Sequence, residues 1–178
     1  MAHSVEEPEW NLLGNIEQVE IRQYEATIEA VTELPGKNHT SAGFRRLAGY
    51  IFGGNETGES IAMTAPVREN LVQSRPEMAF TMPSEYQLDQ LPQPDDTSVS
   101  FVEVPPRTVA VIRFSGWATS RNVANRQREL LSTLDSNGVA VTGYPSLNQY
   151  NPPWTPPFLR RNEIMIEVLP ASLPESGI

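Results

Sequence analysis

The chain has 178 residues, a formal net charge of −9 and no cysteine. This length suffices to bury the core of one compact domain, and the lack of cysteine excludes disulfides, thiolate ligands and a cysteine nucleophile. The negative charge argues against sequence-independent binding to nucleic acid and against docking on an anionic membrane, because both need a basic surface.

We expect a soluble, cytoplasmic protein, although removal of an export signal stays open. The N-terminal residues have neither the basic start nor the apolar run of a signal peptide. No stretch reaches the roughly 18 apolar residues of a membrane-spanning helix. We predict an acidic, flexible lead-in over residues 1–16, a single domain over residues 17–170 and a tail over residues 171–178.

The first half of the predicted domain carries a strand, a helix and two further strands. Apolar and polar residues alternate from Tyr24 to Ala30, which predicts a half-buried strand, and the opposite parity of Val19 and Ile21 indicates a bulge near Arg22. Apolar residues at helical spacing then predict a helix over residues 40–53, capped by Thr40 or Ser41 and ended by Gly53–Gly54. Alternating patterns predict the two further strands at residues 61–67 and 77–82.

The second half repeats this plan after a polar linker. The pattern predicts strands at residues 99–104 and 108–114, a helix over residues 119–136, and strands at residues 139–144 and 163–168. Each half therefore reads as strand, helix, strand, strand, although the two halves share no visible sequence identity. The predicted fold class is α+β, with antiparallel strands and one helix covering apolar surface in each half.

Residues 144–168 are the most distinctive stretch. Four prolines between Pro152 and Pro157 exclude a helix or a central strand, and they hold the adjoining aromatic residues in an extended loop. Without further information this loop is a rigid cover over one end of a sheet. Three other segments add a family pattern to it: Val19–Tyr24, Ile61–Val67 after Gly53–Gly54–Asn55, and Phe114–Ser115–Gly116.

In their order along the chain, the four segments resemble the SOUL haem-binding family over roughly residues 17–169. The resemblance implies a distorted antiparallel β-barrel with two long helices and two pseudo-repeated halves. It also implies a fold related to gyrase-inhibitor-like and effector-binding domains.

Catalytic residues are hard to find in this chain. Its only histidines are His3 and His39, and it lacks nucleophile-elbow, phosphate-loop and zinc-protease motifs. The parity of the strands predicts solvent-facing carboxylates, at Glu25, Glu29, Glu163 and Glu167. Glu163 belongs to the Arg160–Arg161–Asn162–Glu163 motif, so we expect an Arg–Glu pair that anchors the loop. We assign no catalytic residue and expect no metal ion.

The haem ligand proposed for some animal members of the family is a histidine before the first strand. Residues 8–24 of this chain contain none, so that role cannot be transferred. Haem can also be held by apolar walls and by cations that pair with its propionates. The first helix supplies such residues, and His39 is a weaker candidate beside it; the set is Phe44, Arg45, Arg46, Leu47, Tyr50 and Ile51. The alternative is that the apolar members form the core face of the helix and the arginines are surface charges.

We therefore expect a non-enzymatic protein that binds, transports or buffers haem or another tetrapyrrole, with no nucleic-acid or membrane partner. One alternative is a module that binds an apolar or cationic small molecule, for which Tyr144, Tyr150 and Trp154 offer aromatic faces. A third possibility, an enzyme that uses the ligand-binding cleft of this domain, is less favoured. The loop is expected to be mainly structural at the rim of the cleft, with Trp154 contributing packing if its ring is buried. Sequence leaves the oligomeric state open.

Overall fold

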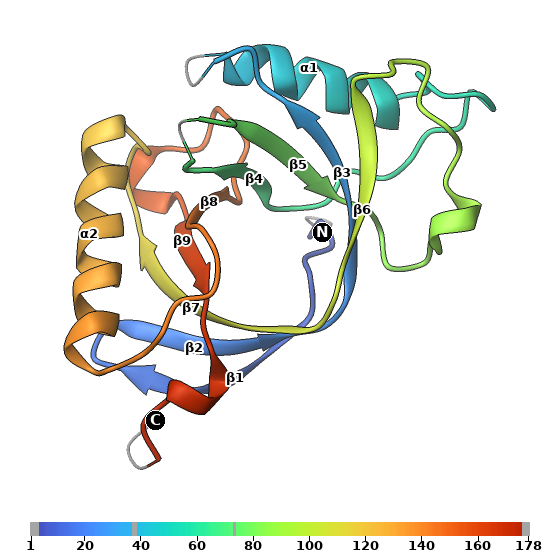
Figure 1. Cartoon of the computed structure of the whole chain (residues 1–178). Coiled ribbons are helices and arrows are strands. Elements are labelled where there is room, and N and C mark those ends of the chain that lie inside the picture. Colours follow the sequence, from blue (N-terminus) through green and yellow to red (C-terminus); the bar gives the residue numbers. More distant parts are fainter. Residues whose placement is uncertain (1–3, 37–38, 73, 176–178) are drawn as a thin grey trace. The chain divides into compact units, whose positions relative to one another are not determined.

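The computed structural model describes residues 4–36, 39–72 and 74–175, so His3 lies outside the described residues. The chain divides into two compact units (Figure 1). Unit 1 takes the residues up to Pro8 together with Ala26–Pro105, and unit 2 takes Glu9–Glu25 together with the residues from Pro106 onward.

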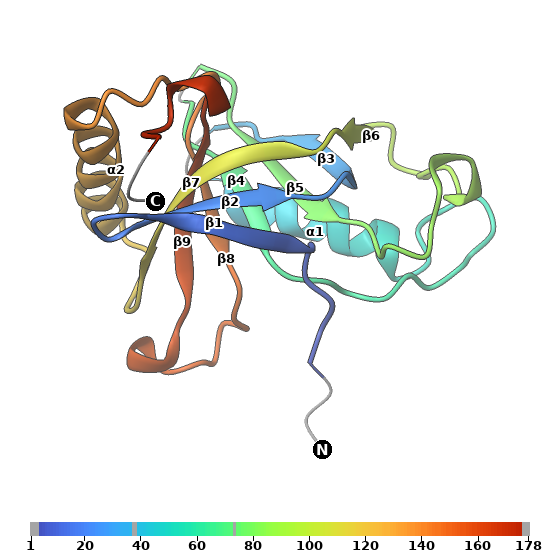
Figure 2. The same ribbon diagram turned by 90° about the horizontal axis from the view of Figure 1, so that it is seen from below.

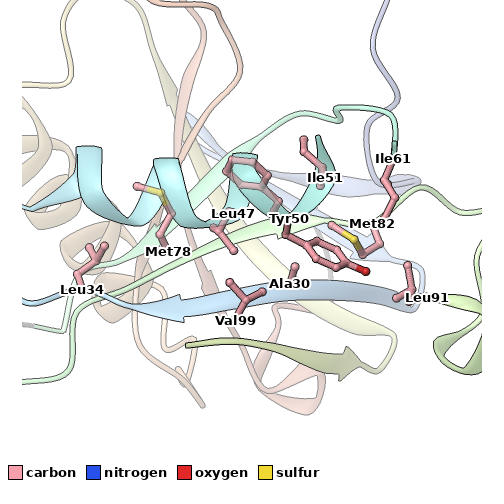
Figure 3. Close-up of a cluster of buried hydrophobic side chains, with 11 residues drawn as sticks. Ala30, Leu34, Leu47, Tyr50, Ile51, Ile61, Met78, Met82, Leu91 and Val99 are labelled. Atoms are coloured by element: carbon pink, nitrogen blue, oxygen red, sulfur yellow. The ribbon is translucent and has the colours of Figure 1, made fainter. Parts of the chain in front are cut away.

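Unit 1 is an antiparallel sheet covered by one helix. Its strands lie in the order β4–β5–β3–β6, and the helix α1 follows β3 along the chain. The elements are β3 (Thr27–Glu33), α1 (Thr40–Ile51), β4 (Val67–Asn70), β5 (Glu77–Thr81), the 3-10 turn η1 (Leu88–Gln90) and β6 (Val99–Val104). Figure 3 shows how Leu47, Tyr50 and Ile51 of α1 meet side chains of the sheet such as Ala30 and Met78 in one buried cluster.

Unit 2 has the same architecture with one additional strand. Its strands lie in the antiparallel order β1–β2–β7–β9–β8, and the helix α2 follows β7 and packs on β7 and β9. The elements are β1 (Trp10–Ile16), β2 (Val19–Tyr24), β7 (Arg107–Phe114), α2 (Ser120–Ser136), β8 (Ser146–Gln149), η2 (Pro157–Leu159), β9 (Asn162–Glu167) and η3 (Pro170–Ser172).

The predicted pseudo-repeat is present in the strand pairing. In unit 1, β3 pairs with β5 and β6, and β5 pairs with β4. In unit 2, β7 pairs with β9 and β2, and β9 pairs with β8. The series β3–α1–β4–β5 therefore corresponds to β7–α2–β8–β9. The α+β class, the antiparallel strands and the two helices are confirmed, and each helix ends within two residues of its predicted bounds.

The two helices start differently. Thr119 caps α2, because its side chain accepts a hydrogen bond from the backbone N–H of Asn122. The N-cap of α1 is His39, which makes no capping bond through its side chain, so the predicted cap at Thr40 or Ser41 is wrong.

Three predicted strands differ from the structure. The strand expected from Tyr24 is two strands, because β2 ends at Tyr24 and β3 begins at Thr27. The change of parity is therefore a change of strand and not a bulge at Arg22. The strand expected at residues 61–67 is an irregular segment up to Pro66, and β4 begins only at Val67, because proline has no N–H to donate to a strand ladder.

The strand expected at residues 139–144 is also wrong, since only an isolated bridge between Val141 and Val168 occurs there. The strand β8 lies instead at Ser146–Gln149, where we expected loop. A further strand, β1, lies within the stretch that the sequence suggested was a lead-in. Within the described ranges, no helix is long and apolar enough to span a membrane.

Candidate functional site

The inner face of α1 belongs to the core of unit 1. Leu47, Tyr50 and Ile51 are at most 2% exposed and lie in the buried cluster of Figure 3. The Tyr50 hydroxyl donates a hydrogen bond of 2.7 Å to the Pro92 carbonyl. Burial raises the pKa of Tyr50 to about 12. These three members of the predicted ligand set therefore pack α1 against the sheet of unit 1.

The outer face of α1 is accessible. Phe44 is 43% exposed and packs edge-on against Phe80, with ring centroids 5.4 Å apart. Arg45 is exposed, and Phe52, immediately after the helix, is 69% exposed. Between these two residues lies Gly49, which faces open space: a Cβ atom added there meets no atom within 4 Å.

Arg46 is only partly available, because its Nη1 donates a hydrogen bond of 2.9 Å to the Glu33 carbonyl. His39 is exposed at the start of α1, and its backbone N–H donates to the Gly36 carbonyl over 3.0 Å. No group of three or more His, Cys, Asp or Glu side chains that could hold a metal ion occurs in the part of the chain that the structure describes.

Unit 2 contains a buried ion pair that the sequence analysis missed. Glu163 of β9 and Arg22 of β2 are both 0% exposed. Arg22 donates from Nη1 to Glu163 Oε1 and from Nη2 to Glu163 Oε2, each over 2.9 Å, which is the bidentate geometry of a strong charge-assisted pair. Arg22 also bonds the Tyr24 hydroxyl and the Glu20 carboxylate, and its guanidinium lies 4.0 Å from the centre of the Trp10 ring.

Two solvent-facing carboxylates were therefore predicted wrongly. Glu163 is buried, and its main partner is Arg22 rather than an arginine of the loop; Arg161 lies farther away, at 3.5 Å. Glu29 is 8% exposed and pairs with Arg68 at 2.8 Å. Both faces of β3 and β9 are covered over most of their length, so alternation of residue types could not tell which face meets water.

The ion pair controls the protonation of its neighbours. Burial alone would raise the pKa of Glu163, yet its hydrogen bonds and charge interaction with Arg22 hold the pKa below its usual value. Burial raises the pKa of Tyr150, whose hydroxyl donates to Glu163 Oε1 over 2.7 Å, and the negative charge of Glu163 raises it further. Burial also raises the pKa of Tyr24. The cluster therefore keeps the Glu163 carboxylate ionised and the Tyr24 and Tyr150 hydroxyls protonated beside the Arg22 guanidinium.

The Pro-dense loop is fastened by Arg160. This side chain is 9% exposed, and its Nη1 donates to the carbonyls of Pro152, Pro153 and Thr155 over 3.1–3.4 Å. The loop is tied to the turn after β7 as well, since the Gly116 N–H donates to the Pro157 carbonyl. Trp154 is 82% exposed, so the condition that its ring packs inside is not met.

Two of the aromatic residues expected to offer faces to a cationic ligand have different surroundings. Tyr144 is 77% exposed, and the face of Tyr150 is already covered by Arg161, whose guanidinium lies 3.6 Å from the ring centre. A signal for the buried cluster was present in the sequence. Arg22 and Glu163 each belong to a motif of the family resemblance, and the structure brings these two motifs together.

Comparison with known proteins gives consistent matches. Residues 5–167 match the family described as SOUL heme-binding protein. Heme-binding protein 1 of Bos taurus is 28% identical over 148 residues, covering 79% of this chain and 76% of the relative. Heme-binding protein 2 of Mus musculus is 27% identical over 189 residues, covering 92% of this chain and 90% of the relative.

Among solved structures, the C-terminal domain of EcmrR superposes with a TM-score of 0.67 at 13% identity, covering 85% of this chain and 97% of that domain. An uncharacterized conserved protein from Listeria innocua gives a TM-score of 0.61 at 10% identity, covering 85% of this chain and 92% of that protein. At these identities the two structures establish a shared fold.

Proposed function

Because the chain belongs to the SOUL haem-binding protein family, we propose that it binds haem or a related tetrapyrrole without catalysing a reaction on it. The observation that carries this proposal is the family match over residues 5–167. The curated relatives named heme-binding protein 1 and 2 support it, since they align over most of their length.

The outer face of α1 is the proposed binding surface. A porphyrin needs a flat apolar surface for its ring and cations for its propionates. Four exposed positions share one face of the helix at helical spacing: Ser41, Arg45, Gly49 and Phe52. The open space at Gly49 leaves this face flat between the Arg45 charge and the Phe52 ring, and Phe44 adds a partly exposed aromatic edge.

In this proposal Leu47, Tyr50 and Ile51 hold the helix in place, while Phe44, Arg45 and Phe52 contact the ligand. Arg46 remains a candidate partner for a propionate, although it would share its guanidinium with the Glu33 carbonyl. The proposed face contains no histidine, so the iron is not expected to depend on imidazole.

The alternative of a cationic small-molecule ligand is less well supported. Glu163 is the carboxylate buried among aromatic side chains, and a cation there would have to displace Arg22 from its bidentate pair.

A haemin titration followed by the Soret band tests the proposal. Wild-type protein should take up one haemin with saturation. The double variant Arg45→Glu, Phe52→Ser should bind at least about tenfold more weakly, because it loses one ring contact and reverses one charge that faces the propionates. Arg75→Glu makes the same charge change at another exposed site of unit 1 and should leave the dissociation constant within about twofold.

Each part of the proposal can fail separately. Nonsaturable uptake no tighter than by serum albumin would refute tetrapyrrole binding itself. Equal weakening by Arg75→Glu would refute the α1 surface while leaving the ligand class standing. His39→Ala should preserve the Soret spectrum, and loss of that spectrum would identify His39 as the iron ligand.

A further inference from the structure

One end of unit 2 exposes four large apolar side chains. Trp154 is 82% exposed, Phe158 76%, Leu159 62% and Trp117 51%. Three of them lie on the Pro-dense loop between β8 and β9, and Trp117 lies on the turn between β7 and α2 (Figure 2). We call these four residues the aromatic tip. Soluble proteins rarely expose large apolar side chains in a group, and such groups usually mark an interaction surface.

The aromatic tip is held rigidly. Arg160 bonds three carbonyls of the loop, and its guanidinium stacks over the Trp117 ring with a separation of 5.0 Å from the ring centre. The Asn162 amide donates to the Gly116 carbonyl, and the Gly116 N–H donates to the Pro157 carbonyl. The two segments that carry the tip are therefore fastened to each other, and little conformational entropy is lost when the tip binds.

The charge around the tip differs from that of the rest of the chain. Residues 104–128 and 136–162 contain seven arginines and no aspartate or glutamate, although the whole chain has a net charge of −9. Near the tip, Arg121 is exposed in the first turn of α2 and the Arg113 side chain is 54% exposed. Arg161 is 26% exposed. The first acidic residue after the loop, Glu163, is buried and paired.

We propose that the aromatic tip and the neighbouring arginines dock unit 2 on the surface of an anionic lipid bilayer. Tryptophan and phenylalanine side chains are suited to the headgroup region, where an apolar ring can enter the acyl boundary. Arginines pair with lipid phosphates and are attracted by the negative potential of an anionic surface. Figure 2 shows the loop projecting beyond the ends of β8 and β9. A projecting loop is better suited to shallow insertion into a bilayer than to binding in a groove of another protein.

The expectation that this chain has no membrane partner was based on its net charge. Net charge averages over the molecule, whereas attraction to a charged surface acts within about 10 Å at moderate salt. Most of the negative charge lies in unit 1, which holds 13 of the 22 acidic residues and five of the 13 basic ones. The end of unit 2 described above combines exposed aromatic rings with sequence segments that contain arginine and no acidic residue.

Vesicle sedimentation tests the proposal with the full chain. Wild-type protein should sediment with vesicles of phosphatidylcholine mixed with phosphatidylglycerol, and much less with phosphatidylcholine alone. The pair Trp154→Ala, Phe158→Ala should lower the partition coefficient at least about tenfold, because it removes the two most exposed rings of the tip. Arg121→Glu should lower it at least about fivefold, and added salt should weaken the wild type.

Two controls match these variants. Phe52→Ser removes a ring of unit 1 that is 69% exposed, and Arg75→Glu reverses an exposed charge there; both should bind vesicles like the wild type. Tryptophan emission of the wild type should shift to the blue on binding, and the shift should be smaller when Trp154 is replaced.

Failure to sediment with anionic vesicles would overturn the proposal, and so would equal loss in the control variants. Concentration-dependent self-association that disappears in Trp154→Ala, Phe158→Ala, without vesicle binding by the wild type, would assign the tip to a contact between copies of the chain and would also overturn it. The tip variant should titrate haemin like the wild type, so this proposal and the proposed function can fail independently.

Discussion

Arg22 and Glu163 form a fully buried, bidentate ion pair, so each residue is indispensable while the other remains. Two charges taken out of water stabilise a fold only when their geometry and hydrogen bonds compensate the loss of hydration. Here the compensation is extensive, because the two Tyr hydroxyls of Tyr24 and Tyr150 and the Glu20 carboxylate complete the shell.

Replacing one member of this pair should be strongly destabilising. We expect Arg22→Met to lower the free energy of unfolding by about 3–5 kcal/mol, because it leaves a buried carboxylate without its cation. Arg113→Met removes an arginine that is 54% exposed and 3.9 Å from the same carboxylate, so it should cost less than about 1 kcal/mol. Urea denaturation measures both.

The double variant Arg22→Met, Glu163→Leu separates the charge from the packing. It should be more stable than Arg22→Met alone, because no buried charge is left unpaired. A double variant less stable than both single variants would show that packing around the guanidinium matters more than the charge.

At the scale of elements, α1 offers two glycines in opposite surroundings. A Cβ atom at Gly43 would overlap with Leu34 Cδ2, whereas a Cβ atom at Gly49 would meet nothing within 4 Å. Gly43→Ala should therefore destabilise by about 1–3 kcal/mol through overpacking. Gly49→Ala should stabilise by about 0.5–1 kcal/mol, since alanine is the better helix former.

Thermal and urea unfolding of these two variants test how α1 packs on its sheet. The comparison is internal, because both changes add one methyl group to the same helix. If Gly43→Ala were neutral, Leu34 would have room to move and the packing described for α1 would be too tight.

The loop between β8 and β9 owes its shape to Arg160 and not to its aromatic rings. Trp154→Ala should change the free energy of unfolding by no more than about 0.5 kcal/mol, because the ring is 82% exposed. Arg160→Met should cost about 1–3 kcal/mol, because three loop carbonyls lose their buried donor.

Proteolysis of the native protein provides a second measurement for the loop. Arg160→Met should be cut within residues 151–159 faster than the wild type, whereas Trp154→Ala should not. Equal resistance in both variants would mean that the prolines alone hold the loop.

At the scale of the whole molecule, both units carry buried groups that limit stability at extreme pH. Tyr50 in unit 1 has its pKa raised to about 12, and the pKa values of Tyr24 and Tyr150 in unit 2 are also raised, in each case chiefly by burial. Unfolded tyrosines ionise near pH 10, so stability should decline as pH rises from about 10 towards 12.

At acid pH, the stability of the fold should decrease as the pH falls. The pKa of Glu163 is held below 4.5, so its contribution is present above that value and is lost as pH falls through the lower pKa of the folded state. Melting temperatures measured at intervals from pH 2 to 12 test both limits. The melting temperature should begin to fall below about pH 4.5 and above about pH 10. Tyr50→Phe should show a shallower alkaline decline, and an unchanged decline would exclude Tyr50 as a contributor.

The sequence predicted the two helices more accurately than the strands. Helical spacing and terminating glycines located α1 and α2, because a helix forms from residues close together in the chain. The strands at 61–67 and 139–144 were misplaced, since alternation records a face but not whether a partner strand lies alongside.

The sequence also predicted only part of the candidate site. The aromatic and basic residues of α1 were found from the sequence, but their sorting into a buried and an exposed face required the packed sheet beneath them. The pairing of Arg22 with Glu163 joins residues 141 positions apart, and no local pattern carries that information.

The division of the chain into units also bears on how it is synthesised. Unit 2 is assembled from two stretches of sequence with Ala26–Pro105 between them. A ribosome releases β2 early, yet the partner strand β7 begins only at Arg107 and Glu163 comes later still. Throughout that interval the nascent chain carries Arg22 without its carboxylate, whereas every strand partner within unit 1 lies between residues 27 and 104. The β1–β2 pair can form early and β7 can join it next, but the buried ion pair of unit 2 is complete only once Glu163 has been synthesised.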